Sequence, residues 1–562
     1  MTGSLHPEQL ASLVAVDALL RRQAARGEPL ASWELSTLVG DVAMQRAVER
    51  VMARSGDQRS EVGREDFDAR ARAVAAEAES DLRGVLGALR VQAEIGGWGA
   101  DSDRAVRAAR VAFVRLYEAG LLARTDAVLD SCPSCDTVVD AADADEVELV
   151  VDLLRIRVPT SGEPLEVELD QPELLVGAVA LAVPEHLGIA DEYLVLPLVD
   201  DAVPVVTVEG IDEPRLVVPG HDRWSHGLAR QLGYPLVEVL DAEGVVCRPG
   251  PLEGLGRYAA RQSATALLAE DGHVVGHSEG VRQVTRCYRC HTVLVPLLGR
   301  HWLLSYGELV EPVVEAIEAG AVRFVPPVGL DELVSSGRRS GAWCVSQQLW
   351  SGQPIPVFTC LDCGQTKVTV EDRASCGSCM GTLEQDPDVL DARFVAAVAP
   401  LVMLGWPGAA LNEVAADVAL VVGPVGLETW ALPMAALGLR LAGRIPFDEV
   451  VVQRPTETGT DAGAMAASEV LRRVEEMGPR AARAALLLGE FGTAATSDVV
   501  GTVDHPPSGD ADLESWVEPY DHALAVYDAR SALGMLLDVL REGVPISAAS
   551  RVHALARPLL SE

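Results

Sequence analysis

The strongest clue to the fold is the sequence CLDCGQTKVTVEDRASCGSCMGTLEQDPDVLD, which spans residues 360–391. It opens with two Cys-x-x-Cys pairs, Cys360 with Cys363 and Cys376 with Cys379, about a dozen residues apart. This spacing is typical of a zinc ribbon, in which four thiolates surround one ion as a tetrahedron. The competing interpretation is chance clustering or redox pairs. Because four thiolates leave no coordination position for water, the predicted zinc is structural.

Two further Cys-x-x-Cys pairs, Cys132 with Cys135 and Cys287 with Cys290, are widely separated in the sequence. They are too distant for a local ribbon. They bracket a segment rich in β-branched residues, however, and could meet at its base. The sequence therefore predicts a second structural zinc site with these four thiolates as its ligands.

The remaining cysteines and the N-terminal residues bear on the cellular compartment. Eight of the ten cysteines fall into the four pairs, which in a reducing compartment favours metal binding over disulfides. Cys247 and Cys344 are left over and are expected to be small, buried hydrophobic side chains. The first residues have neither a basic nor an apolar leader region, and no apolar run reaches the ~20 residues of a membrane span. The sequence predicts a cytoplasmic protein that does not enter a membrane.

Composition excludes a disordered chain and indicates an acidic surface. The 562 residues are 49% hydrophobic, which suffices for several cores, and we expect two to four domains. Lys and Arg number 46 against 83 Asp and Glu, for a net charge of -37, and Lys367 is the only lysine. Such a chain should repel nucleic-acid phosphates unless its arginines gather on one face. The alternative is a general acidic bias of the source proteome.

The pattern of apolar residues changes along the chain. Over 1–140 they recur mainly at helical spacing, which predicts a helix-rich segment. Over 141–290 short β-branched runs are separated by Gly, Pro and Asp, which predicts a β-rich inserted domain. Over 291–485 helical segments alternate with strand candidates, which predicts an α/β unit with a parallel sheet. Residues 486–562 are expected to form a short helical appendage.

Around the cysteine pairs the sequence resembles the valyl-tRNA synthetases, a branch of the class I aminoacyl-tRNA synthetase family. The clearest similarity is QDPDVLD at 385–391, followed by LGWP at 404–407. WCVSQQLWSGQPIPV at 343–357 looks like the family's approach to its zinc knuckle, and TGSLH at 2–6 looks like its opening motif. The resemblance covers roughly residues 1–485.

This resemblance implies an α/β fold and a domain order. The family has a Rossmann-type nucleotide-binding core that is interrupted by a β-rich editing domain and followed by a helical anticodon-binding domain. By similarity, 1–140 and 291–485 would be the two halves of the core, with the zinc ribbon at 360–379, and 141–290 would be the editing-like insertion. Residues 486–562 are too few for the usual anticodon domain, so we expect the reading of tRNA identity to be lost.

The first signature motif of the family is altered. Its His-Ile-Gly-His sequence corresponds here to His6-Pro7-Glu8-Gln9, so the second histidine is Gln9. The small glycine that admits adenine in the family is Glu8, whose negative charge would face the phosphates. ATP binding is therefore not expected at this motif.

The second signature motif has lost its cations. The family's Lys-Met-Ser-Lys-Ser loop corresponds to residues 464–468, where Met465 and Ser468 remain and both lysines are alanine. Adenylate formation needs positive charge and donors aimed at the phosphates of ATP. With a single lysine in the chain a substitute is not expected, so the resemblance points to the loss of ATP and magnesium binding. No catalytic residue can be assigned.

Two segments that the family uses for valine and adenosine have also changed. Its Asp-Thr-Trp-Phe sequence is Asp391-Ala392-Arg393-Phe394 here, and its Asp-His pair is replaced by Leu and Val at 38–39. We expect the amino-acid pocket to be rebuilt or filled.

The editing-like insertion keeps part of the family's editing pocket. Its Thr-Thr-Arg-Pro-Glu-Thr run corresponds to LDQPEL at 169–174, without the hydroxyls and the arginine, whereas His221 and Asp222 of its Pro-Ala-His-Asp run remain. Asp222 could hold an α-ammonium group. The alternative is that His221 and Asp222 form a retained structural turn.

These observations predict a catalytically degenerate relative of valyl-tRNA synthetase that binds or regulates without forming adenylate. The alternatives are a valine-type, ATP-dependent class I ligase with a rebuilt site, or a deacylase of aminoacyl-tRNA in the insertion. The partner would be an amino acid, an aminoacyl-tRNA or a protein. The acidic charge argues against binding of free tRNA.

Overall fold

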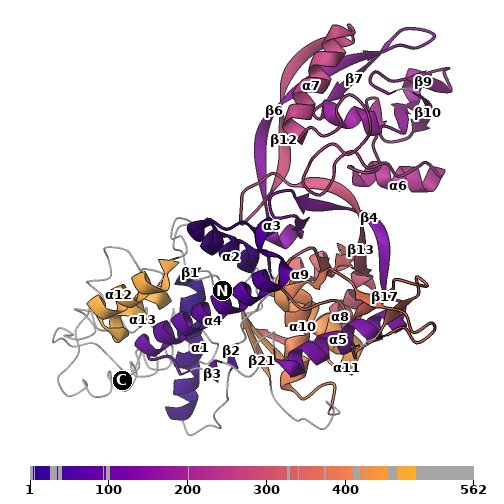
Figure 1. Ribbon diagram of the computed structural model, residues 1–562. Helices are drawn as coiled ribbons and strands as arrows, with labels where there is room; N and C mark the ends of the chain where they lie inside the picture. The colour runs from indigo at the N-terminus through magenta and orange to yellow at the C-terminus, as the bar shows by residue number, and fades with distance from the viewer. Residues whose placement is uncertain are drawn as a thin grey trace. The chain divides into compact units, whose positions relative to one another are not determined.

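The computed structural model divides into two compact units, each of which is considered by itself (Figure 1). Unit 1 consists of Met1–Leu122, Leu304–Trp343 and Trp350–Glu562, and unit 2 consists of Ala123–Leu303 and Cys344–Leu349. The structure describes residues 4–5, 7–25, 34–35, 41–92, 94–95, 102–199, 201–325, 330–339, 341–372, 375–408, 418–423, 426–452 and 465–488.

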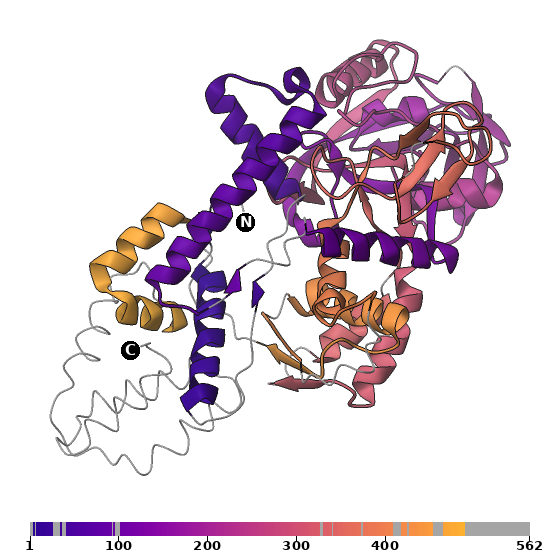
Figure 2. The ribbon, with the colours of Figure 1, turned by 60° about the horizontal axis from the view of Figure 1, so that its bottom comes forward.

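One part of unit 1 is a group of packed helices from both ends of the described chain. Helix α1 (Pro7–Ala25) packs against α13 (Pro479–Leu488), and α12 (Ala467–Met477) packs against both α13 and α4 (Arg64–Ala88). The turned view in Figure 2 shows these early and late helices side by side. Helix α2 (Val42–Ser55) packs on α4 through an apolar face, as its helical spacing predicts.

A buried ion pair links helices α13 and α1. Arg483 and Asp17 have side chains that are 0% and 2% exposed, and Arg483 Nη1 lies 2.8 Å from Asp17 Oδ2. Asp17 also accepts hydrogen bonds from Arg21 Nε and from the Gln92 backbone N–H, both at 2.8 Å. Because a buried charge is costly without its partner, removing either member of the pair should destabilise this helix group strongly.

The second part of unit 1 is an α/β assembly around a parallel sheet. Its strands follow the order β14 (Arg323–Val325), β22 (Glu449–Val452), β21 (Ala419–Val422), and both pairings are parallel. This confirms the α/β prediction for the second half of the chain. Helix α10 packs against α5 and α11. Helix α8 packs against α11 and α9. Their bounds are α5 Asp103–Glu118, α8 Tyr306–Glu318, α9 Leu330–Arg339, α10 Ala392–Met403 and α11 Leu432–Ala442.

A small antiparallel sheet in unit 1 carries one set of cysteine pairs. Its order is β18 (Thr366–Val368), β17 (Val357–Cys360), β19 (Leu383–Gln385). Strand β17 ends at Cys360, so the first cysteine pair lies in the turn that leads into β18. Lys367, the chain's only lysine, lies on β18.

Unit 2 is β-rich. Strands β6 (Ala144–Val158) and β12 (Val274–Cys287) form a long antiparallel ribbon that β7 (Leu165–Leu169) extends, and Ala144 pairs with Cys287 at one end. Helix α7 (Arg257–Glu270) lies along this sheet in Figure 1 and contributes Ala260, Ala264 and Leu268 to its core. Alternate residues at the end of β6 (Leu154, Ile156, Val158) and along β7 (Leu165, Val167, Leu169) fill this core, whereas Val150 of β6 and Val281 of β12 are exposed.

The second sheet of unit 2 holds the segment with His221. Its order is β11 (Arg215–Val217), β8 (Ala180–Pro184), β10 (Ala202–Val208), β9 (Tyr193–Val195), in which only β8 and β10 are parallel. Helix α6 (Arg223–Leu232) follows β11 directly. The remaining elements are β1 Ser4–Leu5, β2 Glu34–Leu35, α3 Arg59–Val62, β3 Glu94–Ile95, β4 Leu122–Cys132, β5 Thr137–Val138, η1 Ala141–Asp143, η2 Pro172–Gly177, η3 Glu185–Leu187, β13 Val295–Leu304, β15 Trp343–Cys344, β16 Ser346–Gln347, β20 Val389–Leu390, η5 Leu427–Ala431 and β23 Met465–Ala466.

Several expectations fall outside the described residues. They concern His6, the positions 38–39 and 464, and nearly all of the predicted C-terminal appendage, from residue 489 onward. Among the residues that the structure describes, none of the helices has the length and apolar character needed to span a membrane.

Candidate metal centres and signature segments

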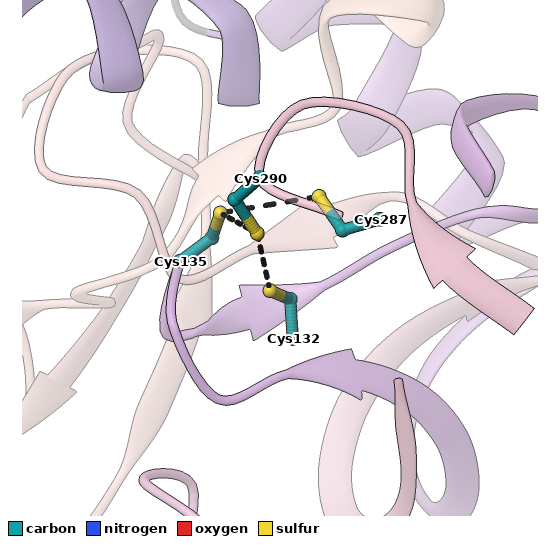
Figure 3. A group of neighbouring side chains, drawn as sticks. All are labelled: Cys132, Cys135, Cys287 and Cys290. Carbon is teal, nitrogen blue, oxygen red and sulfur yellow. Dashed lines mark hydrogen bonds between the residues drawn. The ribbon is translucent and has the colours of Figure 1, made fainter. Parts of the chain in front are cut away.

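The four distant cysteines of unit 2 come together at one place. Figure 3 shows Cys132 and Cys135 on one loop and Cys287 and Cys290 on another, with their sulfur atoms turned toward one another. The Sγ atoms of Cys132 and Cys290 are 3.4 Å apart, those of Cys135 and Cys290 3.6 Å, and those of Cys135 and Cys287 4.0 Å. The first loop follows β4, and the second begins where β12 ends opposite Ala144. The register of the ribbon therefore brings cysteines more than 150 residues apart to one site.

The surroundings of these thiols favour a cation. Hydrogen bonding with Cys132 and burial raise the pKa of Cys135 far above its ordinary value. The hydrogen bonds that Cys287 receives from Cys132 and Cys135 lower its pKa strongly. Four thiols this close cannot all ionise unless a positive ion neutralises them, because each thiolate raises the cost of the next.

The cysteines of unit 1 form a second, more exposed group. The Sγ atoms of Cys360 and Cys379 are 3.5 Å apart and those of Cys363 and Cys376 are 3.8 Å apart. Cys360 and Cys376 are buried, whereas Cys363 and Cys379 are exposed. In the first group three of the four thiols are buried and Cys290 is intermediate.

Both groups have the dimensions of a tetrahedral zinc site. In each group the four sulfur atoms lie within 4.8 Å of one another. A zinc ion with Zn–S bonds of ~2.3 Å in a tetrahedron requires S···S separations of about 3.8 Å. The donor set is four sulfurs, which zinc favours, and it leaves no position for a substrate. These residues could hold two zinc ions, each with a structural role.

The structure brings the two signature segments next to each other. Strand β1 pairs with β23 in antiparallel register, with Leu5 opposite Met465 and Ser4 opposite Ala466. Helix α1 begins at Pro7, directly after the first segment, and carries Gln9 in its first turn. Proline is favoured at the first position of a helix, so this substitution suits the local structure.

Ala467, which by sequence similarity corresponds to the second signature lysine, is packed into the protein. Helix α12 begins at Ala467, which is 4% exposed and shares the buried face of the helix with Val470 and Val474. Ser468, the next residue, is exposed. The following residue, Glu469, forms ion pairs with Arg472 and Arg473, whose guanidinium groups lower its pKa. Arg472 also pairs with Glu476, so the two glutamates balance the two arginines of this helix segment.

The segment that replaces Asp-Thr-Trp-Phe forms a closed network. Asp391 accepts a hydrogen bond from Trp343 Nε1 at 3.0 Å. It also forms an ion pair with Arg393, whose Nη2 lies 2.9 Å from Asp391 Oδ2. The Arg393 guanidinium lies 5.9 Å from the centre of the Trp343 ring, and Phe394 and Tyr306 also pack against that ring. Asp391 and Arg393 have side chains that are only 3% and 12% exposed, so their charges are used within the protein.

His221 is engaged by the backbone on both ring nitrogens. Its Nδ1 lies 2.9 Å from the Pro296 carbonyl oxygen, and its Nε2 accepts hydrogen bonds from the backbone N–H groups of Val239 and Leu240. This pattern requires a neutral ring with its proton on Nδ1. Burial accordingly lowers the pKa of His221 to about 4.

Asp222 caps helix α6. Its Oδ2 accepts hydrogen bonds from the backbone N–H and the hydroxyl of Ser225, at 2.9 and 2.6 Å, and lies 3.0 Å from Arg215 Nη2. Arg215 in turn lies over the Trp224 ring. Of the two sequence interpretations, these contacts favour the structural turn, because the carboxylate that could hold an ammonium group is already committed.

Residues 169–174, the other segment compared with the family's editing pocket, contain one member of a buried ion pair. Glu173, which lies on η2, has a side chain that is 1% exposed, and Arg261 of α7 donates to it from Nε and Nη2. Sequence reasoning did not identify Arg261, because nothing local marks a helix arginine as the partner of an acid 88 residues away. The Pro-Glu pair at 172–173, which the family's run shares, was the one available signal.

One sequence expectation about the unpaired cysteines is wrong. Cys247 is exposed and Cys344 is intermediate, so neither is the buried hydrophobic side chain that its residue type suggests. Cys247 lies in an irregular loop, where its Sγ contacts the Val239 carbonyl oxygen. Residue type alone could not locate it in a loop.

Comparison with known proteins identifies the family of the chain. The family described as tRNA synthetases class I (I, L, M and V) matches residues 1–459. The chain belongs to this family. The resemblance read from the sequence motifs is therefore confirmed, as is the α/β synthetase fold class.

Among the class I synthetases the valine enzymes are similar to this chain. Valine–tRNA ligase of Geobacter sulfurreducens is 32% identical over 470 residues, which is 80% of this chain and 53% of the ligase. That of Thermotoga maritima is 31% identical over 475 residues, covering 81% and 54%. A solved leucyl-tRNA synthetase complex from Agrobacterium radiobacter has 14% identity and a TM-score of 0.49, covering 100% of this chain and 82% of that chain. This synthetase-family chain spans about half the length of the curated valine relatives that it matches.

Proposed function

We propose that this chain is a valyl-tRNA synthetase-like protein that does not form aminoacyl-adenylate and acts by binding or regulation. The observation that carries the proposal is the burial of Ala467 at the place of a signature lysine. An ammonium group there would have to leave the apolar face of α12, and a charge left on that face would be costly. The only lysine of the chain lies on β18, within the cysteine-bearing sheet, and not on either signature segment.

The pairing of β1 with β23 adds to this argument. In our proposal these two strands carry the family's two phosphate-handling segments, so their adjacency means that the substitutions act at one site. That site lacks both lysines and carries Glu8 where the family has glycine. Since the transition state of adenylation accumulates negative charge on the phosphates, each lost cation or donor costs about 3–4 kcal/mol of stabilisation.

The network around Trp343 supports the loss of amino-acid binding. The Arg393 side chain takes the place of an aromatic residue of the family's amino-acid segment, and it is held between Asp391 and the Trp343 ring. A pocket for a free amino acid would need these groups to separate. In our proposal they remain together and serve the packing of α10.

The proposed domain order follows the family. Residues 1–140 and 291–485 would be the two halves of a Rossmann-type core, with a zinc ribbon at 360–379, and 141–290 would be the editing-like insertion. Residues 486–562 would be a short helical appendage. Two zinc ions would hold the cysteine groups, and the protein would work in the cytoplasm with an amino acid, an aminoacyl-tRNA or a protein as its partner.

ATP–pyrophosphate exchange tests the proposal. The full chain with two equivalents of zinc is incubated with valine, magnesium ATP and labelled pyrophosphate, with and without tRNA. We expect no exchange above a no-enzyme blank, while an active valine–tRNA ligase serves as the positive control. Saturable, valine-dependent exchange would overturn the proposal in favour of a ligase with a rebuilt site.

The deacylase alternative has its own test. Release of amino acid from mischarged tRNA would require Asp222 to leave its cap on α6 and bind the substrate's ammonium group. We expect no release by the wild-type chain. If release occurs and Asp222→Ala abolishes it while Asp212→Ala does not, the insertion is a working editing domain.

A further inference from the structure

Helix α5 carries a concentration of positive charge that contrasts with the acidic chain. Within its 16 residues it has four arginines against two acidic side chains, Asp103 and Glu118, whereas the whole chain has a net charge of -37. Arg104, Arg107 and Arg115 are exposed on one face of the helix, at positions separated by three and eight residues. An arginine track of this kind is what an acidic protein needs in order to bind an anion.

This face opens onto a pocket. A cavity of about 550 Å³ is lined by Arg104, Arg107 and Arg115 of α5, together with Val111 and the loop of residues 405–408 that follows α10. Trp406 and Pro407 of that loop join Val111 in giving the cavity an apolar wall. Pockets of 300–1,000 Å³ with apolar walls and a few converging polar groups are typical of small-ligand sites.

The three arginines differ in how they are held. Arg115 lies over the Trp406 ring, with its guanidinium carbon 5.3 Å from the ring centre, and no carboxylate among the described residues pairs with it. Arg107 forms an ion pair with Glu371, in which both side chains are largely exposed. Arg104 Nη2 lies 3.4 Å from the Val402 carbonyl oxygen. Arg115 is therefore a preorganised cation. Arg107 is held only by a weak, exposed ion pair with Glu371, which an anionic ligand can displace.

We infer that this pocket binds a nucleotide, with the phosphate at the arginines and the base or sugar against Val111 and Pro407. The volume exceeds what a lone phosphate needs, and the combination of guanidinium donors with an apolar wall suits a ligand that has both parts. Arginine presents a planar fork of donors that matches phosphate oxygens. The ligand is either a free mononucleotide or the end of a single-stranded RNA, since both offer the same phosphate and base.

The site is separate from the signature segments and does not depend on the proposed function. Neither Met465 nor Ser468 lines it. A chain that fails to exchange pyrophosphate can still bind a nucleotide here, and a chain that does exchange pyrophosphate would leave this inference open to its own test.

Calorimetric titration of the zinc-loaded full chain with AMP, and separately with a short oligoadenylate, tests the inference. We expect saturable binding that weakens as salt is raised, because the phosphate contacts are electrostatic. Tighter binding of the oligoadenylate than of AMP, with AMP competing, identifies an RNA end as the ligand, and equal or weaker binding identifies a free nucleotide.

Three variants locate the binding. Arg115→Gln should weaken it by about tenfold or more, as loss of a charged hydrogen bond does. Glu371→Gln should strengthen it by about twofold to threefold, because it releases Arg107 from its exposed ion pair, and damaged folding would not produce this gain. Arg300→Gln is the matched control, since it removes the same charge from an exposed side chain on β13 and should leave binding unchanged. Absence of saturable binding, or equal binding by wild type and Arg115→Gln, would overturn the inference.

Discussion

The cysteine groups and the signature segments differ, by similarity to the family, in which of its residues they retain. All eight paired cysteines are present and are brought together in two sets whose dimensions fit zinc. At the paired strands β1 and β23, by contrast, we propose that the residues that meet the phosphates of ATP in the family are replaced, and Ala467, which follows β23, is buried. Under the proposed function, this chain has kept residues that stabilise the fold and lost residues that serve catalysis.

The buried cysteine group should contribute most to stability. Cys132→Ser should reduce bound zinc from two equivalents to one and lower the free energy of unfolding of unit 2 by about 4–5 kcal/mol. The reason is that the metal closes a loop of more than 150 residues. Elemental analysis measures the zinc, and urea unfolding measures the stability. Cys247→Ser, the matched control at an unpaired cysteine, should change neither, and unaltered zinc content in Cys132→Ser would refute the site.

The exposed cysteine group should contribute less. Cys363→Ser should also remove one zinc, but the loop that this metal closes is only about a dozen residues long, so the expected loss is about 3 kcal/mol. The effect should be local. Hydrogen exchange should become faster in β17, β18 and β19 while the ribbon of β6 and β12 keeps its protection. Loss of protection in both places would mean that the two groups are not independent.

His221 should make unit 2 less stable in acid. Its pKa is about 4 in the folded protein against an ordinary value of 6.5, so the unfolded chain takes up the proton first as the pH falls. The stability that neutral His221 provides is complete above pH 6.5 and declines by about 2–3 kcal/mol as the pH falls to 4. His301, whose pKa is also lowered to about 4, acts in the same direction.

The variant His221→Gln isolates this contribution. It leaves His301 in place, so its unfolding free energy should fall less between pH 7 and pH 4 than that of the wild type. Identical pH profiles would indicate that His221 is not held neutral, and a catalytic or binding role for its ring would have to be reconsidered.

Restoring a signature lysine should harm the protein without reviving chemistry. Ala467→Lys should cost about 1–2 kcal/mol, because the ammonium group must be forced out of the buried face of α12. Ser468→Lys, the same side chain at the adjacent exposed position, should be nearly neutral. Neither variant should show pyrophosphate exchange. A stable Ala467→Lys protein with exchange activity would reverse the contrast between the two regions.

The sequence by itself determined what depends on local spacing and composition. The two Cys-x-x-Cys pairs at 360–379 predict a metal site from sequence alone, because a loop of about a dozen residues is short enough to bring both pairs to one ion. The motifs around them identify the family. Helical and strand periodicity marked the change from helix-rich to β-rich segments, since the period of apolar residues follows directly from backbone geometry.

Only the tertiary structure decided what depends on distant partners. The register of β6 with β12 brings Cys287 and Cys290 to Cys132 and Cys135, and packing buries Ala467. The cap that Asp222 forms on α6 and the pairing of Glu173 with Arg261 likewise depend on where other elements lie. A residue type states which bonds a side chain can form, but burial and neighbours determine which of them it makes, and here those choices separate a structural residue from a functional one.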